Sequence, residues 1–151
     1  RSPGVGRIID VVTQPWIIAV QLFRALGAIF LTLYATDKMP GLFAWPAGVG
    51  DVIVGLLAPI VALAYASDAR RNEGLVKAWN VFGILDLVVA VTTGFITAPS
   101  PLFTYQPPNE LISVFPLVLI PVYFVPLAVL LHLASLAKLH RRLAPMATAS
   151  A

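Results

Sequence analysis

An arginine inside an apolar run is the first feature of this sequence that could do chemistry. The segment QLFRALGAIF places Gln21 and Arg24 in residues 16–35, which are otherwise almost entirely apolar. On an ideal helix at about 100° per residue, the face of Arg24 and Gln21 also holds Ala25, Ala28, Thr32 and Ala35. An unpaired guanidinium is costly in an apolar helix. We therefore expect a carboxylate from another helix beside Arg24.

Two later segments carry carboxylates on similar small-residue faces. Asp51 lies in GVGDVIVG and Asp86 in GILDLVVA, each three positions after a glycine. Because these segments are expected to run antiparallel, the shared pattern weakly resembles the inverted repeats of transporters. Depth along the helices predicts that Arg24 pairs with Asp86, with Asp51 nearer the outer surface and Asn80 nearer the cytoplasm.

Together, these side chains form a predicted polar intramembrane core consisting of Gln21, Arg24, Asp51, Asn80 and Asp86. Ionisable groups inside a membrane are expensive and often mark a solute or proton path. A matched ion pair can equally be a static clamp between helices. Both interpretations stay open from the sequence.

Two histidines complete the list of groups that could do chemistry. His132 shares a helix face with Ala128 and Ser135, and it could shuttle protons, ligate haem or hold a pigment magnesium, or simply hydrogen-bond to a neighbouring helix. His132 and His140 cannot chelate one ion together, and the chain has no cysteine and no HExxH pattern. No metal site and no catalytic residue is predicted, any cofactor is unknown, and an enzyme is the least favoured class.

Composition indicates whether these groups lie in a soluble protein or in a membrane protein. The chain is 59% hydrophobic and 11% charged, with a mean hydropathy of +0.89, whereas about a quarter of the residues of a soluble domain are charged. Runs long enough to cross a bilayer cover residues 15–36, 47–66, 77–97 and 110–138. The predicted fold class is all-α, an integral membrane bundle of four transmembrane helices over residues 15–138.

Charge distribution predicts the orientation of that bundle. Arginine and lysine residues precede the first span, lie between the second and third, and follow the fourth, whereas the opposite side carries only Lys38. By the positive-inside rule, both termini are cytoplasmic. Residues 1–14 are expected to form an interfacial segment and residues 139–151 a cytoplasmic tail. The scattered cations suit anionic lipids, and nucleic-acid binding is not expected.

Proline recurs through the fourth span. Pro116, Pro121 and Pro126 each remove a backbone donor, so the helix should kink or unwind locally. The prolines do not share one face. This spacing favours a curved, well-packed helix over a gating hinge.

Four blocks of the chain carry a resemblance to a known group of proteins. QLFRALG, LFAWPAGVGD, AWNVFGILDLVVAV and PLVLIPVYFVPLAVLLH together resemble an uncharacterised family of small bacterial polytopic integral membrane proteins with no assigned function. The similarity runs from Gln21 to His132. It implies a multi-pass protein of the bacterial inner membrane, and it supplies no substrate, cofactor or catalytic residue.

Two functions from different classes follow. The favoured one is a non-catalytic accessory or scaffold subunit of a larger membrane complex, with other membrane subunits or a second copy as partners, because the chain has short loops and no sizeable soluble domain. The alternative is a small solute or proton-coupled transporter that uses Asp51, Asp86 and His132.

Overall fold

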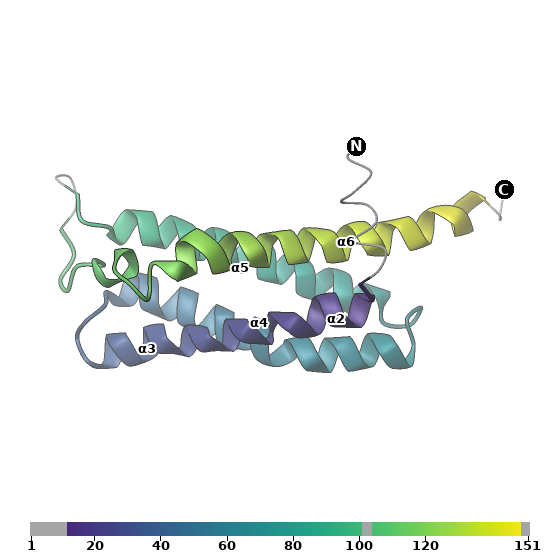
Figure 1. The fold of residues 1–151 in the computed structure, drawn as a ribbon, viewed down its shortest axis with the longest axis horizontal. Coiled ribbons are helices and arrows are strands. Elements are labelled where there is room, and N and C mark those ends of the chain that lie inside the picture. The colour runs from purple at the N-terminus through teal and green to yellow at the C-terminus, as the bar shows by residue number, and fades with distance from the viewer. Residues whose placement is uncertain (1–11, 101–103, 149–151) are drawn as a thin grey trace.

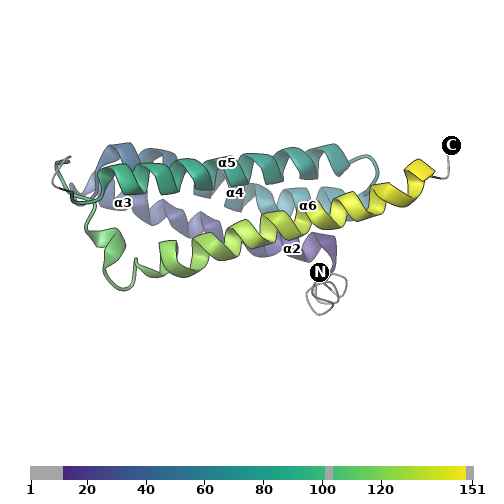
Figure 2. The ribbon, with the colours of Figure 1, turned by 90° about the horizontal axis from the view of Figure 1, so that it is seen from above.

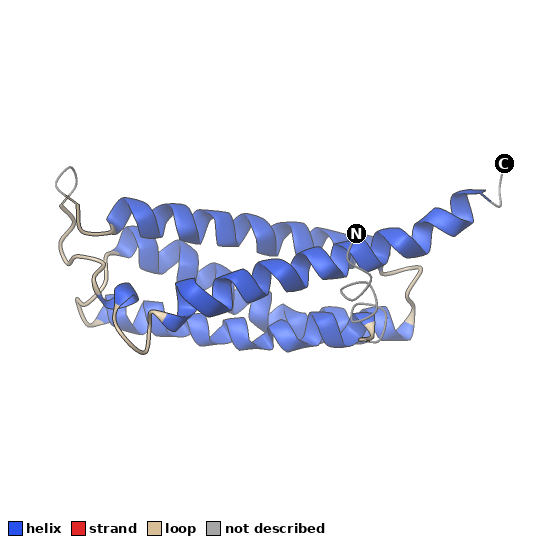
Figure 3. Cartoon of the chain, turned by 45° about the horizontal axis from the view of Figure 1, so that its top comes forward, coloured by secondary structure: helices blue, strands red, loops and turns tan. Residues whose placement is uncertain are grey.

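Every element of the described chain is helical. The computed structural model describes residues 12–100 and 104–148, so the predicted interfacial segment 1–14 lies outside the described residues except at its C-terminal edge. Four stretches of this chain are long and apolar enough to cross a membrane. They run side by side along the length of the molecule (Figure 1, Figure 3). Their bounds are Gln14–Ala35, Gly41–Ser67, Glu73–Thr97 and Ile120–Arg141.

The first span consists of three helical pieces. These are α2 (Gln14–Ala19), the 3₁₀ helix η1 (Val20–Gly27) and α3 (Ala28–Ala35). A 3₁₀ helix has three residues per turn, so Gln21, Arg24 and Gly27 line up on one face, and all three are buried. The helical wheel was therefore wrong for the second half of the face, because Ala28, Thr32 and Ala35 are exposed.

The second and third spans are single helices, α4 (Gly41–Ser67) and α5 (Glu73–Thr97). Helix α4 begins six residues before the predicted 47, since Pro40 lies at its N-cap and Pro46 is accommodated inside the helix. Aromatic packing fixes this added turn against the first span. The Phe43 and Phe30 rings lie 5.0 Å apart.

The fourth span corrects the predicted range 110–138. Residues 114–118 form turns, the short 3₁₀ helix η2 covers Leu111–Ser113, and the membrane-length helix begins only at Ile120. It opens with a π-helical turn, η3 (Ile120–Phe124), and continues as α6 (Val125–Thr148). The backbone is unwound locally, as the prolines predicted, because Pro116 lies in the turns and Pro121 in the π-helical turn, whereas Pro126 is accommodated in the first turn of α6. Helix α6 also continues through most of the predicted tail 139–151.

The loops that connect the spans lie at the two ends of the molecule. The α4–α5 loop, the start of α2 and the C-terminal part of α6 lie at one end, and α6 projects beyond the other helices there (Figure 1, Figure 2). We name this the basic end because it carries Arg70, Arg71, Lys77, Lys138 and Arg141. The α3–α4 and α5–α6 connections lie at the opposite end, which we name the loop end.

Two apolar cores occupy these two halves. The core of the basic-end half is built from the four spans and comprises Ile18, Val54, Ala58, Val61, Ala62, Tyr65, Val76, Trp79 and Leu139. The core of the loop-end half comprises Phe30, Met39, Phe43, Ala44 and Ala47. Between the two cores lies a layer of buried polar side chains, near the middle of each span.

Candidate functional site

Each of the four spans contributes one titratable side chain to a single cluster. The residues are Arg24 from η1, Asp51 from α4, Asp86 from α5 and His132 from α6. The Arg24 side chain is only 2% exposed, and those of Asp51 and Asp86 are 15% and 7% exposed. We refer to these four residues as the charged cluster.

Arg24 is the centre of the charged cluster. Its Nε donates to Asp51 Oδ1 at 2.7 Å, its Nη2 lies 2.7 Å from the same oxygen, and Nη2 also donates to Asp86 Oδ2. Nη1 donates to the Gly83 carbonyl oxygen at 3.3 Å and lies 3.2 Å from His132 Nε2. The planar fork of an arginine suits such a multidentate site.

The contact of Arg24 with Asp86 was predicted and is present. The placement of Asp51 nearer the outer surface was wrong, because Asp51 reaches the same guanidinium. Helix α4 begins earlier than expected, so Asp51 lies deeper along its span. His132 likewise lies deeper than predicted, near the middle of the fourth span, because that span begins at Ile120.

The surroundings of His132 determine its tautomer. Arg24 has only donors, so Nε2 must be the accepting nitrogen, and we assign the ring proton to Nδ1. Nδ1 then donates to Asn80 Oδ1 at 2.9 Å, and the Gln21 amide lies 3.2 Å from the same nitrogen. Both ring nitrogens are engaged and the residue is fully buried. This arrangement leaves neither nitrogen free to ligate a haem iron or a pigment magnesium.

A second set of polar contacts leads from His132 toward the basic end. Asn80 Nδ2 donates to Ser135 Oγ at 2.8 Å, and Gln14 Nε2 donates to the same oxygen at 2.7 Å. Asn80 was predicted to be part of the site, whereas Gln14 was missed. Gln14 lies seven residues before Gln21, which is two turns of an α-helix, and this spacing is the signal that could have found it.

Glycines leave the space that the charged cluster occupies. A Cβ added at Gly50 would overlap Asp86 Oδ1, and one added at Gly83 would overlap the His132 ring. A Cβ at Gly27 would lie 2.5 Å from Asp51 Cβ. Of these three, only Gly83 belongs to a pattern seen in the sequence, as the glycine three positions before Asp86. Each of these glycines accommodates a polar side chain of a neighbouring span.

Two cavities adjoin the charged cluster on its loop-end side. The larger measures about 400 Å³ and lies between η1, α3 and residues 116–128, with Arg24 and Asp51 at its polar end. The smaller measures about 230 Å³ and lies between α4, α5 and residues 112–125. Asp51 and Leu87 line both cavities.

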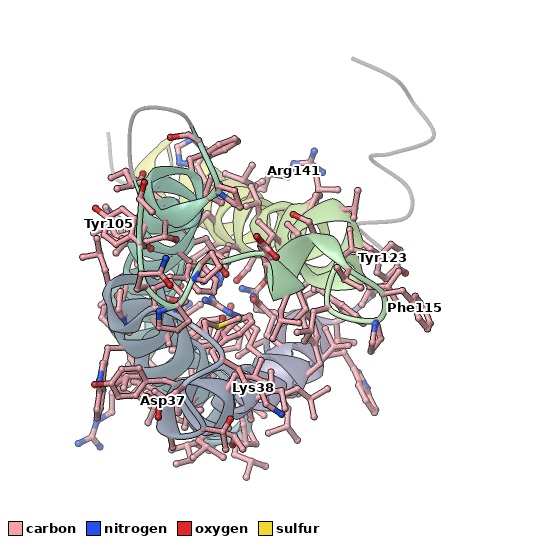
Figure 4. All side chains as sticks on the ribbon, turned by 90° about the vertical axis from the view of Figure 1, so that its left-hand side faces the viewer. Asp37, Lys38, Tyr105, Phe115, Tyr123 and Arg141 are labelled. Carbon is pink, nitrogen blue, oxygen red and sulfur yellow. The ribbon has the colours of Figure 1, made fainter. Side chains whose placement is uncertain are left out.

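The segment between the two cavities, residues 112–125, contains the turns and the π-helical turn that precede α6. Phe115 and Tyr123 mark its outer edge in the view from the loop end (Figure 4). Backbone that leaves α-helical geometry at a cavity is common at functional sites of helical proteins.

The charge of the cluster does not cancel. With two carboxylates, one guanidinium and a neutral imidazole, the ionised cluster has a net charge of −1. Such a charge in the hydrocarbon region is costly, and one bound proton or one bound monovalent cation neutralises it. No group of three or more metal-ligating acidic, cysteine or histidine side chains occurs within residues 12–100 and 104–148.

Comparison with known proteins places the whole cluster inside one family domain. A family model described as a domain of unknown function, DUF8737, matches residues 3–140. No curated protein and no solved structure matches the chain significantly. The charged cluster, the two cavities and the first three spans fall inside the matched region, and so does the fourth span apart from its last residue, Arg141.

Proposed function

Because the chain belongs to the DUF8737 family, whose function is unknown, we propose from its geometry that it is a small proton-coupled carrier. In this proposal, the charged cluster holds one exchangeable proton and the cavities hold the solute. The proposal further puts the protein in the bacterial inner membrane with its basic end in the cytoplasm, and the positive-inside rule supports this orientation.

The observation that carries this proposal is the position of Asp51. Its Oδ1 is held by Arg24, while no residue of the described chain donates a hydrogen bond to Oδ2. Asp51 lines both cavities, and it is the most exposed member of the Arg24–Asp51–Asp86 group. A carboxylate that is fixed on one side and open on the other can exchange a proton without losing its position.

The two halves of the bundle support a directional role. On the basic-end side, the nine buried residues of the apolar core and the contacts of Asn80, Ser135 and Gln14 close the interior. On the loop-end side, the two cavities reach the charged cluster. A carrier must alternate between such closed and open halves.

Infrared difference spectroscopy on the purified full chain tests the exchangeable proton. We expect a pH change to alter a protonated-carboxyl band, and Asp51→Asn to remove that change. Asp37→Asn is the matched control, because Asp37 lies exposed in the α3–α4 loop and its positive φ of 54° is one that asparagine also adopts. If the spectrum shows no pH-dependent carboxyl band that depends on Asp51, the carrier proposal is wrong.

A second candidate is the non-catalytic accessory or scaffold subunit. The observation in its favour is that Arg24 contacts groups from all three other spans, as a structural clamp would. Purification in mild detergent from the native membrane, followed by mass spectrometry, separates the two candidates. Stoichiometric recovery of other subunits, together with the absence of a pH-dependent carboxyl band from Asp51, would favour the scaffold.

A further inference from the structure

We infer that the cavity beside Asp51 binds a hydrophobic monovalent cation, such as a lipophilic amine or a quaternary onium ion, in exchange for one proton. This inference rests on the proposed carrier function and adds the chemical class of its substrate. It depends on the charge of the cluster, the chemistry of the cavity walls and the direction in which the larger cavity opens.

The charge of the cluster selects for a cation. Arg24 directs its donors at two carboxylates, a carbonyl oxygen and an imidazole nitrogen, so its guanidinium is already engaged. Among the residues that line the larger cavity, the polar atom that remains for a ligand is Asp51 Oδ2, which, when ionised, can only accept a hydrogen bond or contact a positive charge. An anion would meet this carboxylate and is therefore disfavoured.

The walls of the larger cavity select for an apolar body. Apart from Arg24 and Asp51 at one end, all lining residues are apolar, and they include Phe23 and Phe124. The rings of these two phenylalanines lie 5.4 Å apart in a tilted arrangement. Aromatic faces attract organic cations, more so where water is excluded. The volume of about 400 Å³ suits a small organic molecule and far exceeds a bare metal ion.

The opening of this cavity is directed toward lipid. Leu26, Ile29 and Leu119 line it and are 72%, 39% and 41% exposed on the outer surface of the spans. Phe30 and Phe43 of the loop-end core line the smaller cavity and not the larger one. A substrate that partitions into the bilayer can therefore reach Asp51 laterally.

Charge balance fixes the stoichiometry. With one proton bound, the cluster is neutral, and replacing that proton by one monovalent cation keeps it neutral. The proton leaves Asp51 Oδ2 as the cation approaches the same oxygen. Exchange of one proton for one cation is electroneutral, so the membrane potential should not drive it.

Binding to the purified full chain in detergent tests the substrate class with two ions of the same shape and opposite charge. We expect tetraphenylphosphonium to bind and tetraphenylborate not to bind, as measured by isothermal titration calorimetry. Asp51→Asn should weaken tetraphenylphosphonium binding about ten- to a hundredfold, since it removes a charge-assisted contact. Asp37→Asn should leave binding unchanged.

A second variant tests the cavity independently, in case Asp51→Asn does not fold. Leu26→Trp narrows the lipid-facing mouth of the cavity and should weaken binding, whereas Leu22→Trp, on the same 3₁₀ helix but outside the cavity lining, should not. Both leucines are exposed, so the larger side chain has room in the bilayer.

Three results would overturn the inference: equal binding of the two ions, tighter binding of tetraphenylborate, or binding that neither Asp51→Asn nor Leu26→Trp weakens. If the infrared experiment still shows an Asp51-dependent proton, the carrier proposal stands and only the substrate class fails. If both experiments are negative, the carrier proposal fails as well.

Discussion

Arg24 balances two carboxylates at once, and this has a consequence for mutation. Removing one partner of a buried ion pair leaves an uncompensated charge and typically costs about 3–5 kcal/mol. We expect Arg24→Leu to lower the free energy of unfolding by about this amount, measured by thermal unfolding in a fixed detergent. An unfolding temperature equal to that of the wild type would contradict the buried cluster.

The same contacts change the expected rescue of that variant. If only Asp86 opposed Arg24, the pair Arg24→Leu and Asp86→Leu would restore stability. Because Asp51 also contacts the guanidinium, the double variant leaves one carboxylate unpaired. We expect the double variant to recover only part of the loss and the triple variant, with Asp51→Leu added, to recover most of it.

Gly50 is a further residue whose role comes from the cluster. A methyl group there would overlap Asp86 Oδ1, so we expect Gly50→Ala to displace Asp86 and cost about 1–3 kcal/mol. Gly74→Ala is the matched control, because a Cβ at this helical glycine meets nothing within 4 Å. Thermal unfolding measures the stability of both variants. Equal unfolding temperatures of Gly50→Ala and Gly74→Ala would show that Asp86 does not need the space that Gly50 leaves.

At the scale of elements, helix α6 depends on polar contacts more than the other helices do. The fourth span is the least buried of the four. Asn80 of α5 holds it through Ser135 and His132. We expect Asn80→Ala to raise hydrogen exchange in α6 by leaving buried polar groups unpaired, with little change in α4.

Thr92→Ala is the control for this exchange experiment, because Thr92 is exposed on α5 and bonds only to the Val88 carbonyl oxygen of its own helix. Hydrogen exchange with mass spectrometry measures the exchange of the α6 amides in both variants. Equal exchange of α6 in the two proteins would show that apolar packing alone holds this helix.

Hydropathy predicted the existence and order of the elements but not their inner geometry. Four apolar runs fix four spans, since in lipid the backbone must satisfy its own hydrogen bonds. The 3₁₀ turns around Arg24 were missed because a helical wheel assumes 3.6 residues per turn throughout. The start of the fourth span was missed because Pro116 and Pro121 lie in an apolar run, where hydropathy does not distinguish a helix from a folded loop.

The members of the site were more predictable than their contacts. Charged and amide side chains in apolar runs are conspicuous, so Arg24, Asp51, Asp86 and His132 could be found from the sequence alone. Their common depth in the bundle could not be found from the sequence, because an error of a few residues in a predicted helix start shifts a side chain by several ångströms along the helix axis. The cavities depend on the turns before η3, where the prolines predicted local unwinding but not the position at which the helix begins.

At the scale of the whole molecule, the two ends differ in charge, and this predicts the orientation in the membrane. The α4–α5 loop and the projecting end of α6 carry the cations and should remain in the cytoplasm. The loop end should face the other side. The chain contains no cysteine, so single cysteines can report on each side without a background.

We expect Gly74→Cys, near the basic end, to react with a membrane-impermeant thiol reagent only after intact cells are opened, and Thr104→Cys, at the loop end, to react from outside. Both positions are exposed. Leu139→Cys, buried in the basic-end core, is a control that should stay unreactive in the folded protein. Labelling of Gly74→Cys from outside would invert the orientation, and the cavities beside Asp51 would then lie in the cytoplasmic half of the bilayer.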